Sequence, residues 1–192
     1  MNLEAFRLLD EKRDKMFHWL QKFYIDRCVK APVLRKCRKK QFINLRDAKS
    51  VVLLYEADRV RNDKLMQLIH EIGSLNIVQA WGYTTQNDFA ERETINIHHI
   101  KPKDINFLGK PVPSIEERYL SDTFDILIDL TMQEVIPLKY MLGISRSNCR
   151  CGYVKEGYEG LYDLEVSRMS GKKEEDLLKQ ILFYLTTIQT KL

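Results

Sequence analysis

The sequence predicts an α/β protein, a three-layer Rossmann-like domain with a mainly parallel sheet, an N-terminal amphipathic helix and a C-terminal helix. Residues 50–57 (SVVLLYEA) form a continuous apolar run, which is typical of a strand covered on both faces. A helical stripe and a second strand pattern follow this run. Between Thr123 and Tyr153, a strand pattern, an amphipathic segment and a short strand again have the spacing of a βαβ crossover. Two such units favour parallel strands with helices on both faces.

The first 49 residues are expected to form one long helix and a basic connector packed on the body. Large apolar residues recur at three- and four-residue steps from Leu3 to about Cys28, and Pro32 helps to end this helix. Residues 30–49 show no sustained period and are predicted to wrap the body. Residues 50–192 then form a single α/β domain.

The next elements follow from caps, stripes and breakers. Asn62 is predicted to cap a helix that reaches Ile72, followed by a strand over residues 77–83 and a weaker strand over residues 94–100. Residues 101–113 contain three prolines and a glycine, which predicts a long loop.

The second half contains two pairs with the spacing of a capping box. Ser114 with Glu117 predicts a short helix, and Thr131 with Glu134 predicts the start of the crossover helix after the Phe124 strand. Two short strands are then expected, and the chain closes with an amphipathic helix. These last three elements are predicted near residues 149–154, 161–166 and 172–190.

Composition excludes several protein classes. Apolar residues make up 44% of the 192 residues and charged residues 30%, which is ordinary for a globular protein and unlike a disordered one. No apolar run approaches the roughly 20 residues that span a bilayer, and the start of the chain has no secretory signal pattern. We therefore expect a cytoplasmic location and no membrane partner.

The chain lacks the common cofactor and catalytic motifs. It has neither a GxGxxG nor a GxxxxGK[ST] loop, which bring backbone amides up to phosphate. Its four cysteines are too unevenly spaced for a zinc site or a disulfide framework, although Cys149 and Cys151 should share one strand face. Neither a serine nucleophile elbow nor a Cys-His pairing is identifiable. We therefore expect no cofactor, no metal and no catalytic residue.

The run FDILIDLTMQEVIPLKYMLGISRSNCRCGY, with NFLGKP and INLRDAKSVVLLYEA before it, resembles an uncharacterised family of short cytoplasmic proteins from Bacteroides-type bacteria. About 30 residues of the same run resemble a strand, helix and strand in the N-terminal half of heptosyltransferase-type glycosyltransferases. The first resemblance implies no activity. The second implies a Rossmann-like fold, but Glu56–Val60 replace the glycine turn of those enzymes, and the chain has no room for their donor-binding domain.

Ligands of open parallel sheets bind outside the carboxyl ends of the strands. Polar residues follow three predicted strands here, and a mixed rim of carboxylates, arginines and hydroxyls could bind a small polar molecule. The alternative is that they are helix caps and solvated loop residues. The candidate ligand-binding residues are Asp58, Arg59, Arg61, Thr84, Asp129, Thr131 and Glu134.

Positive charge is concentrated at the start of the chain. Residues 1–49 hold 14 Lys/Arg and 6 Asp/Glu, whereas the remainder holds 17 and 21. The basic arm comprises Arg35, Lys36, Arg38, Lys39 and Lys40, and it could follow a phosphate backbone. A solvated connector is the favoured alternative, since no nucleic-acid-binding motif accompanies these charges.

The sequence alone leaves the function unknown. The working hypothesis is a noncatalytic α/β protein that binds a partner or a small polar ligand. The alternatives are a small transferase-like enzyme that uses the strand-end rim around Asp58, Arg61, Thr131 and Glu134, and nucleic-acid binding through the basic arm. The N-terminal helix is rich in large apolar groups, so a homodimer through this helix is also considered.

Overall fold

A parallel sheet of six strands forms the centre of the protein, as the sequence predicts. The computed structural model describes residues 3–31, 38, 40–72, 77–90, 93–167 and 173–187. The strand order is β3-β2-β1-β4-β5-β6, and every neighbouring pair is parallel. The strands are β1 Ser50–Glu56, β2 Ile77–Tyr83, β3 Ile97–Ile100, β4 Ile126–Asp129, β5 Cys149–Tyr153 and β6 Leu164–Val166.

The order of the strands creates a switch point at the centre of the sheet. From β1 the chain moves outward to β2 and β3, and it then returns to the other side of β1 to form β4, β5 and β6. The connections leaving β1 and β4 therefore diverge at the carboxyl edge. In a doubly wound sheet, ligands bind in the crevice at this point.

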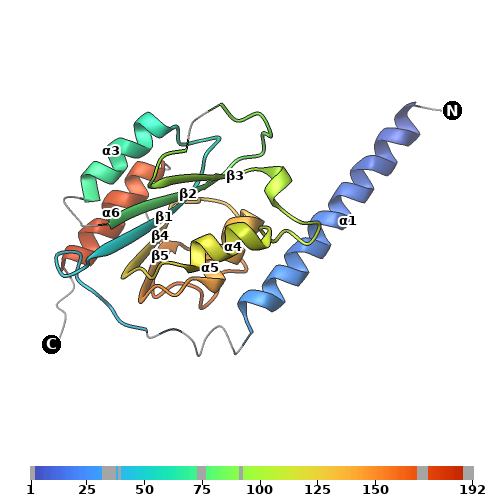
Figure 1. Cartoon of the computed structure of the whole chain (residues 1–192). Helices are drawn as coiled ribbons and strands as arrows, with labels where there is room; N and C mark the ends of the chain where they lie inside the picture. Colours follow the sequence, from blue (N-terminus) through green and yellow to red (C-terminus); the bar gives the residue numbers. More distant parts are fainter. Residues whose placement is uncertain are drawn as a thin grey trace.

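Helices cover both faces of the sheet, which gives the three layers that the sequence predicts (Figure 1). One face packs against α3 and α6, and the other packs against α4, α5 and the C-terminal part of α1. A short 3-10 helix, η1, follows β3. The helices are α1 Leu3–Val29, α3 Asn62–Ile72, η1 Pro102–Asp104, α4 Pro113–Leu120, α5 Ile136–Ile144 and α6 Glu174–Thr187.

Strand β1 shows why a continuous apolar run becomes a central strand. Val51 and Leu53 point into the core under α3 and α6, whereas Val52 and Leu54 point into the opposite core. All four side chains are fully buried because each face has its own helical layer. On β5, the sulfur atoms of Cys149 and Cys151 lie 3.8 Å apart, which confirms that they share one strand face.

Both predicted capping boxes are wrong, although both helices exist. The N-cap of α5 is Val135, because the Thr131 hydroxyl and amide donate hydrogen bonds to Asp129 and are not available to cap a helix. Similarly, the N-cap of α4 is Val112. Each helix has a proline in its first turn, where a missing N–H is tolerated.

Helix α1 crosses α5 at a point where only glycine fits. A Cβ atom on Gly143 of α5 would lie 2.3 Å from Cγ1 of Val29. Val29 and Ile25 are both buried here, whereas the N-terminal part of α1 extends away from the sheet (Figure 1). Close packing of the two backbones therefore fixes the position of α1 on the body.

We predict that Gly143→Ala destabilises the protein by about 1–3 kcal/mol, because the added methyl group overpacks the crossing. Alanine is a better helix former than glycine by about 1 kcal/mol, so helix propensity alone would predict that Gly143→Ala stabilises the protein. Urea denaturation measures the change in the free energy of unfolding. In a double-mutant cycle with Val29→Ala, the combined loss should be smaller than the sum of the two single losses. An additive cycle would contradict the steric explanation.

Candidate ligand-binding site

A cavity of about 360 Å³ lies at the carboxyl edge of the sheet, at the switch point between β1 and β4. Its walls come from the ends of β1 and β2, the loop after η1, the segment that begins α5, and one face of α1. The lining residues are His18, Gln21, Glu56, Asp58, Tyr83, Thr85, Ile105, Gly109, Glu134, Val135, Ile136 and Pro137.

Glu56, the last residue of β1, is only partly neutralised. Its nearest cation is Arg59, whose Nε lies 3.7 Å from Oε2. Its other oxygen, Oε1, is buried and has no hydrogen-bond partner among the described residues. Burial raises the pKa of this carboxyl above its ordinary value, and the charge of Arg59 opposes that rise.

Asp58 lies two residues further along the chain, and its carboxylate, unlike that of Glu56, is fully hydrogen-bonded by neighbouring groups. It accepts hydrogen bonds from the Thr84 hydroxyl at 2.6 Å and from the Thr85 amide and hydroxyl at 2.7 and 2.8 Å. Burial alone would raise the pKa of Asp58, but these three hydrogen bonds outweigh burial and lower it. Asp58 is therefore a fixed negative charge at the cavity.

Glu134 is the third carboxylate of the cavity, and two lysines bind it. Lys139 Nζ lies 2.6 Å from Oε1, and Lys22 Nζ of α1 lies 2.8 Å from Oε2. Burial would raise the pKa of Glu134, but hydrogen bonds from Lys139 and Lys22 lower it. Lys139 is itself fully buried and also contacts Asp26 of α1 at 2.6 Å.

The predicted residues Asp129 and Thr131 lie beneath the rim in a closed network. Asp129 accepts hydrogen bonds from Tyr162 at 2.6 Å and from Lys155 at 2.8 Å, and Thr131 donates to its other oxygen. Lys155 also donates to Thr131 Oγ1 at 2.6 Å. Both Asp129 and Thr131 are buried and satisfied, so they hold the end of β4 and do not line the cavity.

The remaining predicted residues are divided between the cavity and its surroundings. Thr84 is buried and positions Asp58. Arg59 turns toward α6, where its Nη1 lies 3.8 Å from Glu174. Arg61 is exposed just before α3 and is not a lining residue. The structure thus brings only Asp58 and Glu134 of the seven predicted residues to the cavity wall.

Sequence reasoning missed the contributions of α1 and of the loop after η1. His18 and Gln21 reach the cavity only because α1 packs across α5, and no local pattern encodes that long-range contact. Gly109 has φ of +82°, and a Cβ there would lie 2.7 Å from Ile136 Cγ2. A glycine among prolines was the one available indication that this loop approaches another element closely.

The basic arm is only partly described. Arg38 and Lys40 are placed, whereas Arg35, Lys36 and Lys39 lie outside the described residues. The guanidinium group of Arg38 is almost fully buried and forms a bidentate ion pair with Asp163. In this position Arg38 is not exposed to a nucleic-acid backbone, so nucleic-acid binding by the whole arm stays a prediction.

The described residues contain no group of three or more His, Cys, Asp or Glu side chains arranged to hold a metal ion. Within the same residues, every helix is too short or too polar to cross a bilayer.

Comparison with known proteins gives a family but no function. Comparisons with curated proteins and with solved structures gave no match. A family of unknown function, DUF6913, matches residues 21–188, which include the C-terminal part of α1, the complete sheet and α6. The chain therefore belongs to the DUF6913 family, whose members have no assigned function.

Proposed function

We propose that this protein binds a small polar ligand that carries a positive charge, in the cavity at the ends of β1 and β4. The observation that carries the proposal is the carboxyl group of Glu56: the residue lines the cavity, and its buried Oε1 lacks a hydrogen-bond partner among the described residues. A buried acceptor without a donor costs about 1–3 kcal/mol. A ligand that donates a hydrogen bond to Glu56 would remove this cost.

The charges around the cavity support a cationic ligand. Glu134 is neutralised by two lysines, but Asp58 has no ion-pair partner among the described residues, and Glu56 has only a distant one. The wall therefore keeps a negative excess at Glu56 and Asp58. A phosphate or carboxylate ligand would be repelled, whereas an ammonium group would be attracted.

The shape of the cavity supports a small molecule. Its volume of about 360 Å³ lies at the lower end of the range for small-ligand pockets, about 300–1,000 Å³. Ile105, Val135 and Ile136 add apolar side chains to the cavity wall. Tyr83 adds a phenol, whose pKa is raised by burial and by the charge of Asp58, so it remains a hydrogen-bond donor. An amine with hydroxyl groups and a short apolar portion fits this combination.

Acid–base chemistry of the transferase-like kind is a second candidate. One observation favours it: Glu56 and Asp58 line the same cavity, and their environments shift their pKa values in opposite directions. Such pairs often divide the roles of acid and base. The proposed residues then become Glu56 and Asp58, because Thr131 is occupied by Asp129 and Lys155.

The cytoplasmic location, the Bacteroides-type origin and the glycosyltransferase resemblance stay predictions.

We predict that thermal-shift screening will separate ligands by charge. Putrescine and glucosamine should raise the melting temperature, glucose should have a smaller effect, and AMP should have none, because the wall carries a negative excess. Titration calorimetry of the best compound should show affinity falling about tenfold or more in Glu56→Gln and in Asp58→Asn, as expected for losing one charge-assisted hydrogen bond.

The matched control is Glu175→Gln, which removes a half-buried carboxylate on α6 that pairs with Lys64 and does not line the cavity. Affinity should not change in this variant. Preferential stabilisation by AMP, or equal loss of binding in all three variants, would exclude a cation site at this cavity.

The pH dependence of stability gives a prediction that needs no ligand. Because burial raises the pKa of Glu56 above its ordinary 4.5, the carboxyl stabilises the fold when protonated and loses this contribution as pH rises through its folded pKa. Glu56→Gln should therefore be more stable than the wild type at pH 7, and the difference should disappear below about pH 4. Urea denaturation at several pH values measures this. If Glu56→Gln destabilised the protein at pH 7, the Glu56 carboxylate would instead stabilise the folded state.

We also propose that a second copy of the chain covers the exposed apolar stripe of α1. Met16, Trp19 and Phe23 are 62%, 61% and 51% exposed, and the rings of Trp19 and Phe23 stack at 5.7 Å. A helix of 27 residues is about 40 Å long, and its N-terminal part extends away from the body (Figure 1). An apolar stripe is self-complementary across a two-fold axis, which suits pairing between identical helices.

Sedimentation equilibrium should then show a dimer that Trp19→Ser weakens by about 30-fold or more, as for a central aromatic contact. Phe183→Ser is the matched control, since Phe183 on α6 is also 61% exposed. A monomeric wild type at all concentrations would exclude this interface.

A further inference from the structure

Arg150 is a buried cation on β5, and its guanidinium group has no carboxylate partner among the described residues. The residue is 5% exposed. Its Nη2 donates to the Gly143 carbonyl at 3.2 Å and to the Ser145 carbonyl at 2.6 Å, at the C-terminal end of α5. These neutral carbonyls orient the group and interact favourably with it through the helix dipole, but they do not neutralise its charge.

Most of the hydrogen-bonding capacity of Arg150 is unused. Nη2 supplies its two hydrogens to the two carbonyls, whereas Nε is buried without a partner and Nη1 has none among the described residues. Arginine carries five N–H donors, so three remain. A buried donor left unpaired costs free energy that a suitable acceptor would recover.

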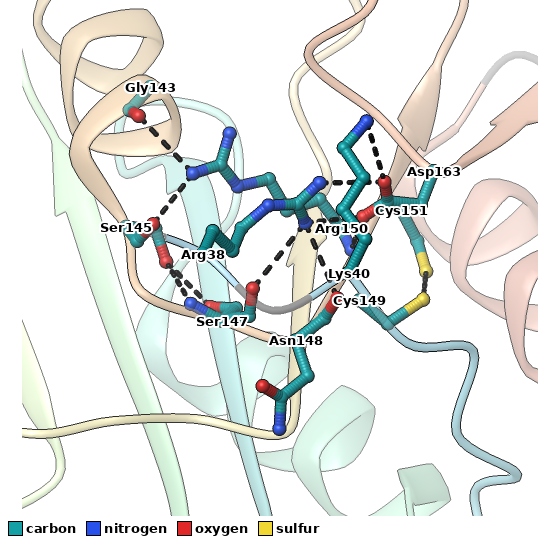
Figure 2. Close-up of polar contacts among 10 residues, drawn as sticks. All are labelled: Arg38, Lys40, Gly143, Ser145, Ser147, Asn148, Cys149, Arg150, Cys151 and Asp163. Carbon is teal, nitrogen blue, oxygen red and sulfur yellow. Dashed lines mark hydrogen bonds and ion pairs between the residues drawn. The ribbon is translucent and has the colours of Figure 1, made fainter. Parts of the chain in front are cut away.

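Two further cations lie beside this group, with one carboxylate among them (Figure 2). Asp163 forms the bidentate pair with Arg38, and its Oδ1 lies 3.5 Å from Nζ of Lys40. Asp163 also accepts the backbone N–H of Arg150 at 2.9 Å. Three positive side chains therefore share one negative charge, and the cluster keeps an excess of two positive charges.

These three cations line one cavity of about 150 Å³. Its other walls are Val29, Gly143, Gly160 and Leu161. The space beside Gly160 is open, since a Cβ there would meet no atom within 4 Å, whereas Val29 occupies the place of a Gly143 side chain. The cavity lies between the start of β5 and the end of α5. It is therefore at the amino edge of the sheet, opposite the cavity at Glu56 and Asp58.

We propose that this second cavity is an anion site that binds a phosphate group, either free or at the end of a small molecule. Arg150 supplies the unused N–H donors, Lys40 supplies a solvent-exposed charge, and Arg38 adds a fixed positive potential. A tetrahedral dianion matches the excess of two positive charges, and arginine is well suited to recognise phosphate oxygens. The volume accommodates a phosphate group but not the length of a nucleic-acid strand. This inference is independent of the proposed cation site.

The direct test is titration of the full chain with inorganic phosphate, observed through the ¹⁵Nε–¹Hε resonances of arginine. The Arg150 resonance, assigned by its loss in Arg150→Lys, should shift with a saturable dependence on phosphate. Sodium chloride at equal ionic strength should not shift it. Parallel titrations with phosphoserine and with serine distinguish a terminal phosphate on a small molecule from free phosphate, and binding of either phosphate supports the proposal.

Lys40→Ala is the informative variant, because Lys40 is 61% exposed and its removal should leave the fold intact. Its phosphate affinity should fall about tenfold, the effect of one charge-assisted contact. Lys64→Ala, which removes a lysine on α3 near α6, is the matched control and should bind as the wild type does.

Three results would overturn the proposal. The first is an Arg150 resonance that responds equally to chloride and phosphate. The second is an affinity that is unchanged in Lys40→Ala. The third is a short RNA that binds through Arg38 and Lys40 with steep salt dependence while phosphate and phosphoserine do not bind, since this would assign the cluster to nucleic acid.

Discussion

The buried amine of Lys139 makes the interactions on which the arrangement of the two proposed sites depends. It lies on α5, is 1% exposed, and contacts Asp26 of α1 and Glu134 of the cavity, each at 2.6 Å. It also lies 4.6 Å from the ring centre of Tyr158. Removing one partner from a buried ion pair costs about 3–5 kcal/mol, because the remaining charge is left unpaired. Lys139 therefore ties α1, α5 and the cavity wall to one position.

The seam between α1 and α5 connects both proposed sites. Residues of α1 line each cavity, His18 and Gln21 at one end and Val29 at the other. Helix α5 has nine residues and is about 13 Å long. Glu134 lies just before its positive N-terminal end, and Arg150 binds carbonyls at its negative C-terminal end. The dipole of α5 thus favours the sign of charge found at each end.

The sheet could be predicted from the sequence because each strand has a local pattern of apolar residues. Residues 50–57 alternate between two cores, and the βα spacing implies parallel neighbours. The predicted cap at Thr131 was wrong for a physical reason. The Thr131 hydroxyl and amide donate hydrogen bonds to the buried carboxylate of Asp129, so they do not cap the helix. Lys139 could not be predicted either, since a lysine in a helix is normally solvated and nothing local shows that α5 is covered on all sides.

The residues of the two cavities could be predicted only in part, for the same reason. Strand ends are local features, so Asp58 and Glu134 could be placed at one edge from the order of elements alone. Arg150 and Arg38 are 112 residues apart in the chain and meet only through the path of the connector, which has no periodic pattern. The sequence therefore predicts a solvated connector at Arg38, and no local pattern singles out Arg150.

The two incompletely compensated groups, Glu56 and Arg150, also limit what the two proposed sites can bind. They have opposite charge, yet they lie at opposite edges of the sheet and cannot neutralise each other through direct contact. Each therefore has to be compensated locally, by a donor or cation at Glu56 and by an acceptor or anion at Arg150. Buried groups of this kind reduce the stability of the free protein, and a ligand that satisfies one of them regains that free energy on binding. Under both proposals, selectivity for the sign of charge follows from the fold itself, because the carboxyl edge carries the acidic excess at Glu56 and Asp58 and the amino edge carries the basic excess at Arg150.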